Sequence, residues 1–182
     1  MPTLQNYLSK NTNLPKVIGK FSLAGSNTLS DGALQIYYTS ENNVNGYFTI
    51  TIYNSGIYVP DELDNPLLLN EYANCKNVFK IMEQRGIYKD VNIILEEPFN
   101  FSADSEPEFL SMILAYLNKL ESGDYIEEIS FFYLRSSYGY FHKIRYSVFR
   151  ADAESNLDSL GEFLFNWNNF INNLREDNLG FK

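Results

Sequence analysis

The segment that decides the fold is residues 47–53, which reads YFTITIY. Phe48, Ile50 and Ile52 alternate with residues that are polar or have a polar tip. Strict alternation of this kind predicts a β-strand with one apolar face. Asn45-Gly46, directly before the segment, is a typical hairpin turn. The sequence therefore predicts a strand of an antiparallel sheet.

Similar segments lie on both sides of this strand. We predict strands over residues 17–23 and 33–39, separated by turn residues that include Asp31-Gly32. After the strand, residues 54–56 indicate a turn, and residues 57–59 are expected to form a short further strand. Four strands joined by tight turns predict an antiparallel meander.

A second strand pair is predicted over residues 126–150. His142, Ile144, Tyr146 and Val148 share one face of its return strand. Phe141, Lys143, Arg145, Ser147 and Phe149 share the other. Tyr138-Gly139 is the expected turn, so this segment is interpreted as one long hairpin. A short apolar strand is expected over residues 91–95.

Three or four helices are expected around this sheet. Asn65-Pro66 predicts a helix start, apolar residues recur at helical spacing from Leu68 to Met82, and Gly86 fits a C-terminal stop. Ser105 with Glu108 resembles a capping box and predicts a helix to about Leu120. Ser155 with Asp158 predicts a last helix in the same way. A short helix is also expected over residues 2–10.

The fold class that follows is α+β. We predict a mainly antiparallel sheet, with an N-terminal four-strand meander and a C-terminal long hairpin, packed by three to four helices. No internal repeat and no linker rich in Pro or Gly divides the chain. A single compact domain over residues 1–182 is therefore expected.

The composition disfavours most familiar active sites. The chain has one His (His142) and one Cys (Cys75), against 14 Tyr and 14 Phe. Metal, nucleophilic and acid–base sites mostly need a His or Cys beside a second such group. Cys75 lies on the apolar stripe of a predicted helix, so a buried, inert thiol is expected. We expect neither a metal nor another cofactor.

The net charge of −9 restricts the partners. A negative chain repels phosphate backbones, so no nucleic acid is expected to bind. The N-terminus lacks a charged region followed by an apolar stretch, and the longest apolar run is too short to span a bilayer. We therefore predict a cytoplasmic protein without a membrane partner; the sequence leaves the oligomeric state open.

The candidate partner-binding residues are acidic and aromatic. They are Glu96, Glu97, Asp104, Glu106 and Glu108, together with Tyr138 and Tyr140 near the expected hairpin tip. The acids could form a docking patch for a basic protein, or hold a magnesium ion or supply an acid–base pair. They could equally be a solvated surface beside a helix N-terminus. The tyrosines suit an interface because of their large area and polar tip.

These observations favour binding over catalysis. The leading hypothesis is a non-catalytic protein that binds a basic protein partner. In size, acidity and aromatic content the chain is similar to small bacterial inhibitors such as immunity proteins. A domain that binds a small apolar ligand is the first alternative, and an enclosed cavity lined by Phe and Tyr would indicate it. A carboxylate-dependent hydrolase is the second, and needs two acids facing one cleft.

Overall fold

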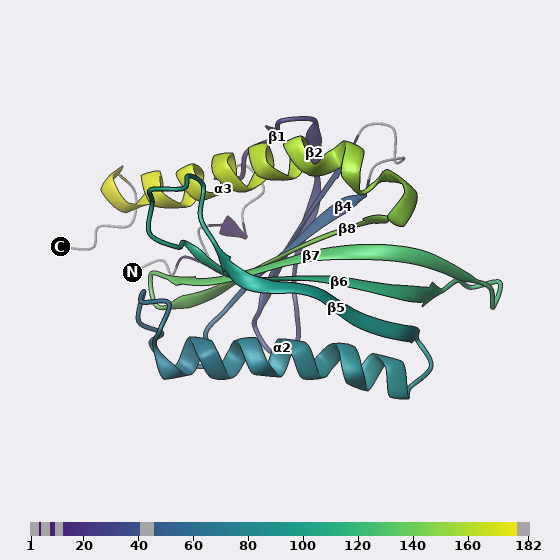
Figure 1. The fold of residues 1–182 in the computed structure, drawn as a ribbon. Coiled ribbons are helices and arrows are strands. Elements are labelled where there is room, and N and C mark those ends of the chain that lie inside the picture. The colour runs from purple at the N-terminus through teal and green to yellow at the C-terminus, as the bar shows by residue number, and fades with distance from the viewer. Residues whose placement is uncertain (1–3, 5–7, 10–12, 41–45, 178–182) are drawn as a thin grey trace.

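One antiparallel sheet organises the molecule, with a long helix on each face (Figure 1). The computed structural model describes residues 4, 8–9, 13–40 and 46–177. The strand order is β1-β2-β3-β4-β8-β7-β6-β5. The strands are β1 (Val17–Ile18), β2 (Phe21–Thr28), β3 (Leu34–Ser40), β4 (Tyr47–Tyr53), β5 (Tyr88–Phe99), β6 (Phe109–Lys119), β7 (Tyr125–Ser137) and β8 (Tyr140–Phe149). The long helices within the described ranges are α2 (Pro66–Gln84) and α3 (Leu157–Asp177).

The pairing of β4 with β8 joins two meanders into this sheet. The register runs from Tyr47 opposite Ser147 to Tyr53 opposite Phe141. Gly46, just before β4, has a φ of 85° and lies against the backbone carbonyl of Ser147. A side chain at this position would overlap that carbonyl, so the pairing depends on glycine here.

The core between the sheet and α3 is aromatic. Phe163 of α3 stacks on Phe48 of β4, with ring centroids 3.7 Å apart. Phe21 packs edge-on against both rings, and Tyr38 packs in the same way against Phe163 and Trp167. These side chains are almost fully buried. The apolar stripes of β4 and α3 expected from the sequence therefore meet in this core.

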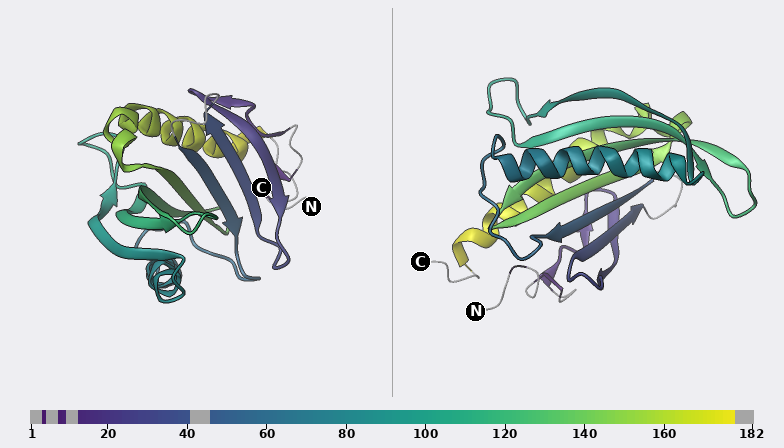
Figure 2. Two further views of the ribbon diagram at one scale, coloured as in Figure 1. Left: turned by 90° about the vertical axis from the view of Figure 1, so that its right-hand side faces the viewer. Right: turned by 90° about the horizontal axis from the view of Figure 1, so that it is seen from below.

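The opposite face of the sheet is only partly covered. Helix α2 packs on β5 and β7 and buries Tyr72, Cys75 and Phe79 there. As Figure 2 shows, the half of the sheet built by β2, β3 and β4 extends beyond α2 on this side. The uncovered strands carry polar and half-buried side chains toward it, among them Gln35 and Thr49.

The expectation of an α+β fold packed by three to four helices is wrong, because the described structure is mainly β with few helices. The described residues contain two α-helices and an eight-stranded sheet. The main error is the helix expected from Ser105 to Leu120, where residues 109–119 form β6. This strand is covered by helices or loops on both faces, so its residues are apolar without alternation, and such a run is ambiguous between strand and helix. Ser105 caps no helix and instead hydrogen-bonds Ser102 in a turn.

Other expectations have mixed outcomes. Helix α2 begins as predicted, because the side chain of Asn65 accepts a hydrogen bond from the N–H of Leu68 (2.9 Å). The strand expected over residues 57–59 does not form, and the one expected over 17–23 is divided by a turn at Gly19. Helix α3 begins at Leu157, and Ser155 lies inside the 3₁₀ turn before it, where its hydroxyl donates to the backbone carbonyl of Asp152 (2.9 Å). The helix expected over residues 2–10 falls mostly outside the described residues.

None of the helices in the described ranges is both long and apolar enough to cross a membrane.

Candidate ligand-binding cleft

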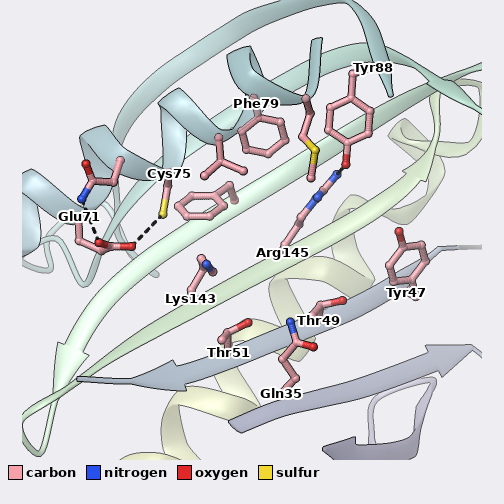
Figure 3. A pocket seen from close by; sticks show the side chains of 14 residues that line it. Gln35, Tyr47, Thr49, Thr51, Glu71, Cys75, Phe79, Tyr88, Lys143 and Arg145 are labelled. Atoms are coloured by element: carbon pink, nitrogen blue, oxygen red, sulfur yellow. Dashed lines mark hydrogen bonds between the residues drawn. The ribbon is translucent and has the colours of Figure 1, made fainter. Parts of the chain in front are cut away.

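A cleft of about 250 Å³ lies between the side of α2 and the open half of the sheet (Figure 3). We call it the α2 cleft. Helix α2 forms one wall, and β3, β4 and β8 form the floor. The side chains that concern its chemistry are Gln35, Thr49, Thr51, Glu71, Cys75, Val78, Phe79, Phe132, Lys143 and Arg145.

Strand geometry brings two cations together in this cleft. Lys143 and Arg145 are two residues apart on β8, so both side chains point to the α2 side of the sheet. The pairing of β4 with β8 places Thr51 opposite Lys143 and Thr49 opposite Arg145. The floor is therefore a pair of cations flanked by hydroxyl groups.

Arg145 is held by aromatic side chains and hydroxyl groups. Its Nε donates to the hydroxyl of Ser130 (2.9 Å), and one Nη donates to the phenol oxygens of Tyr88 (3.1 Å) and Tyr116 (2.5 Å). Its guanidinium carbon lies 5.1 Å from the ring centroid of Phe79. Burial would lower the pKa of Arg145, but the neighbouring Tyr116 and Tyr88 oxygens raise it above its usual value. The guanidinium is therefore fixed and permanently charged.

No carboxylate in the described part of the chain forms an ion pair with Arg145. The nearest link to one runs through Tyr116, whose hydroxyl donates to the carboxylate of Glu128 (3.0 Å). Glu128 is itself buried and accepts a second hydrogen bond from Asn118 (3.0 Å). Glu128 therefore balances the charge of Arg145 only indirectly, through Tyr116. The side of the guanidinium that lines the cleft remains accessible to a ligand.

Lys143 is the second cation and the less constrained one. Its Nζ lies 5.2 Å from the ring centroid of Tyr53, and within the described ranges it has no ion pair. The side chain is half-buried. An ammonium group in this position has donors left for a bound molecule.

Helix α2 adds a carboxylate and a thiol to the cleft. Glu71 accepts hydrogen bonds from the hydroxyl of Tyr53 and from the thiol of Cys75, with 3.6 Å between Sγ and Oε1. Burial raises the pKa of Cys75 to about 12; Lys143 opposes this shift and Glu71 adds to it. The thiol is buried as predicted, and its raised pKa keeps it protonated and unsuited to nucleophilic attack.

The predicted acidic cluster does not gather in one place. Glu96 forms an ion pair with Lys76 of α2 (2.7 Å). Glu108 accepts a hydrogen bond from Asn168 of α3 (2.5 Å), on the opposite face of the sheet. Glu97 is exposed on β5, the strand at the sheet edge, and Asp104 and Glu106 are exposed in the loop that follows. That these acids bind a partner stays a prediction.

The two predicted tyrosines lie on the α3 side of the sheet. The hydroxyl of Tyr138 donates to the backbone carbonyl of Ile171 (3.3 Å), and Tyr140 is partly buried against the same core. Both therefore contribute to packing at the β7–β8 turn. His142, close by on β8, is fully buried.

Among the residues with described positions, no group of three or more His, Cys, Asp or Glu side chains could hold a metal ion.

The cleft residues were not expected to form a site. The alternation in β8 does put Lys143 and Arg145 on one face, and that in β4 does put Thr49 and Thr51 on one face. These signals are visible in the sequence. Their meeting is not, because β4 and β8 are about ninety residues apart and no local pattern specifies their pairing.

Comparison with known proteins assigns no family. No family model and no curated protein matches the chain. Among solved structures, the solution structure of cyanobacterial PsbP (CyanoP) from Synechocystis sp. PCC 6803 is similar at 13% identity and a TM-score of 0.42. The match covers 80% of this chain and 89% of that one. Similarity at this level assigns no function.

Proposed function

We propose that the chain binds a small molecule with an apolar body and an anionic group in the α2 cleft. One observation carries the proposal: Lys143 and Arg145 line the same cavity, and neither has an ion pair in the described part of the chain. Unpaired cations in a partly desolvated site favour an anion, because hydrogen bonds between charged groups are about twice as strong as neutral ones.

The wall opposite the cations suits the apolar part of such a molecule. Val78, Phe79 and Phe132 line the cleft beside the charged floor. Apolar walls with a few convergent polar groups are the usual composition of a ligand site. The cavity of about 250 Å³ lies below the usual range of about 300–1,000 Å³ for ligand pockets, so the expected ligand is small.

Titration calorimetry with a matched pair of probes tests this function. 3-Phenylpropionate has an aromatic body and a carboxylate, and 3-phenylpropanamide has the same body without the charge. We expect the carboxylate to bind at least about tenfold more tightly than the amide. The Lys143→Gln variant should lose most of this preference. Lys119→Gln, which removes an exposed charge of β6 outside the cleft, should keep it.

Two results would reject the function. One is equal affinity for the acid and the amide, which would mean that Lys143 and Arg145 do not favour a charged ligand over a neutral one. The other is an affinity for the acid that Lys143→Gln leaves unchanged. Lys143 is half-buried and makes no ion pair in the described ranges, so this substitution should not disturb the fold.

Docking of a basic protein is a second candidate function. It is favoured by the exposure of Glu97, Asp104 and Glu106 near one end of the sheet, on a chain of net charge −9. A partner captured from a lysate should be lost when these three residues are replaced by Lys, and kept when exposed Asp158 of α3 is replaced instead. Equal capture by both variants would count against docking at this surface.

A further inference from the structure

The α2 cleft also contains a carboxylate that has no cation. Glu71 is half-buried and lines the cleft together with Lys143 and Arg145. Its oxygens accept hydrogen bonds from Tyr53, Cys75 and Asn74, all uncharged groups. Within the described ranges no Lys or Arg lies within ion-pair distance of it. A ligand with an anionic group alone would leave the charge of this carboxylate uncompensated.

Tyr53 keeps the two opposite charges apart. Its hydroxyl donates to Glu71, while the Nζ of Lys143 lies 5.2 Å from the centroid of its ring. The Lys143 ammonium and the Glu71 carboxylate thus contact different parts of the rigid Tyr53 side chain and do not form an ion pair with each other. In Figure 3, Glu71 projects from the α2 wall and Lys143 from the floor. The cleft therefore presents a negative and a positive group to the same space.

A site with separated charges of both signs complements a ligand that also carries both. We infer that the ligand is a free α-amino acid with an apolar side chain, its ammonium group bound by Glu71 and its carboxylate by Lys143 and Arg145. This inference rests on the proposed function, since it names the molecule that the same cleft binds. Val78, Phe79 and Phe132 would contact the side chain.

The dimensions of the cleft agree with a single amino acid. Its volume of about 250 Å³ is below the usual range for ligand pockets of about 300–1,000 Å³. Thr49 and Thr51 line the floor beside the cations and offer hydroxyl donors to a carboxylate. Both charges of the ligand would then be compensated, which desolvated charges require.

Titration calorimetry on two matched pairs of probes tests the inference. L-Phenylalanine is compared with 3-phenylpropionate, and L-leucine with 4-methylpentanoate. The members of each pair differ only in the α-ammonium group. We expect the amino acid of at least one pair to bind about tenfold more tightly than its acid. The Glu71→Gln variant should abolish this difference, because glutamine keeps the size of the side chain but not its charge.

Glu83→Gln is the matched control, since Glu83 lies on the same helix outside the cleft and should leave the difference intact. Retained thermal unfolding temperatures would show that both variants are folded. If the acids bind as tightly as the amino acids, and Glu71→Gln does not weaken the amino acids, the inference is overturned while the proposed function stands. If neither acids nor amino acids bind, the proposed function fails and the inference fails with it.

Discussion

At the scale of single residues, His142 is a titratable group whose pKa is strongly changed by burial. It is 0% exposed, and its Nε2 donates to the backbone carbonyl of Ser137 (3.2 Å). Burial, with a smaller contribution from the charge of Arg135, lowers the pKa of His142 from 6.5 to about 3, although the bond to Ser137 opposes this. The imidazole is therefore neutral in the folded protein at any pH above about 3.

This burial predicts a pH-dependent loss of stability. Well above pH 6.5 His142 is neutral in both the folded and the unfolded chain and contributes no pH dependence. Between pH 6.5 and about 3 the unfolded chain binds a proton that the folded chain does not, so the free energy of unfolding falls as the pH falls. We expect His142 to account for a loss of about 2 kcal/mol between pH 7 and pH 5. Urea titrations at the two pH values measure it.

His142→Gln isolates the contribution of the imidazole. Glutamine retains a donor for the carbonyl of Ser137 but does not titrate. The variant should therefore lose less stability than the original chain between pH 7 and pH 5, even if it is less stable at both. Identical pH dependence in the two chains would show that His142 titrates normally in the folded protein.

Cys75 supports a prediction about reactivity. A thiol with a pKa of about 12 has very little thiolate at pH 8. With an ordinary pKa near 8.5, the thiolate fraction would be about two thousandfold larger. We expect Cys75 to be essentially unreactive toward a disulfide reagent such as 5,5′-dithiobis(2-nitrobenzoate) at pH 8, and fully reactive after unfolding in urea. Rapid stoichiometric labelling of the folded chain would contradict the raised pKa.

At the scale of the elements, two phenylalanines of α3 show what fixes this helix. Phe163 is 0% exposed and stacks on Phe48, whereas Phe165 is 50% exposed and contacts Phe101 at the surface. Phe163→Ala should lower the free energy of unfolding by about 3–5 kcal/mol, because it leaves a cavity in the core. Phe165→Ala should cost about 1 kcal/mol or less. Urea unfolding of both variants makes the comparison, and equal costs would disprove the proposed packing of α3.

The sequence predicts elements well where only one face of them is buried. The period of two in β4 and the helical stripes of α2 and α3 arise because one side of each element lies in the apolar core, while the other side carries more polar residues. Strand β6 has no such contrast. Met112 and Leu114 pack toward α2, while Phe109 and Ala115 belong to the core on the α3 side. Burial on both faces removes the alternation, so the segment was wrongly predicted as a helix.

The candidate cleft could be predicted only in its parts. Each strand of the floor shows which residues share a face, so Lys143 with Arg145 and Thr49 with Thr51 follow from alternation. Their apposition depends on the pairing of β4 with β8, and their enclosure depends on where α2 stops covering the sheet. Both are properties of the assembled fold. The acidic residues around Glu96 are close in sequence but do not form one cluster, because the fold places Glu96 and Glu108 on opposite faces of the sheet.

At the scale of the whole molecule, the two edges of the sheet differ. β1 at one edge has only two residues, whereas β5 at the other has twelve. Ile93, Ile94 and Leu95 of β5 are 37%, 49% and 41% exposed. An exposed apolar edge strand is a template for pairing with another chain, although the register shifts in β5 disturb its ladder. The net charge of −9 opposes such pairing at neutral pH.

The difference between the edge strands β1 and β5 predicts where self-association begins. Near the isoelectric point of about 4.6 the repulsion between chains vanishes, and β5 should then nucleate aggregation. Ile94→Lys places a charge in the middle of β5 and should reduce light scattering at this pH. Val17→Lys adds the same charge to β1, where Val17 is 60% exposed, and should reduce scattering much less. Since both variants shift the isoelectric point equally, only a specific role of β5 separates them, and equal scattering would show that charge alone controls association.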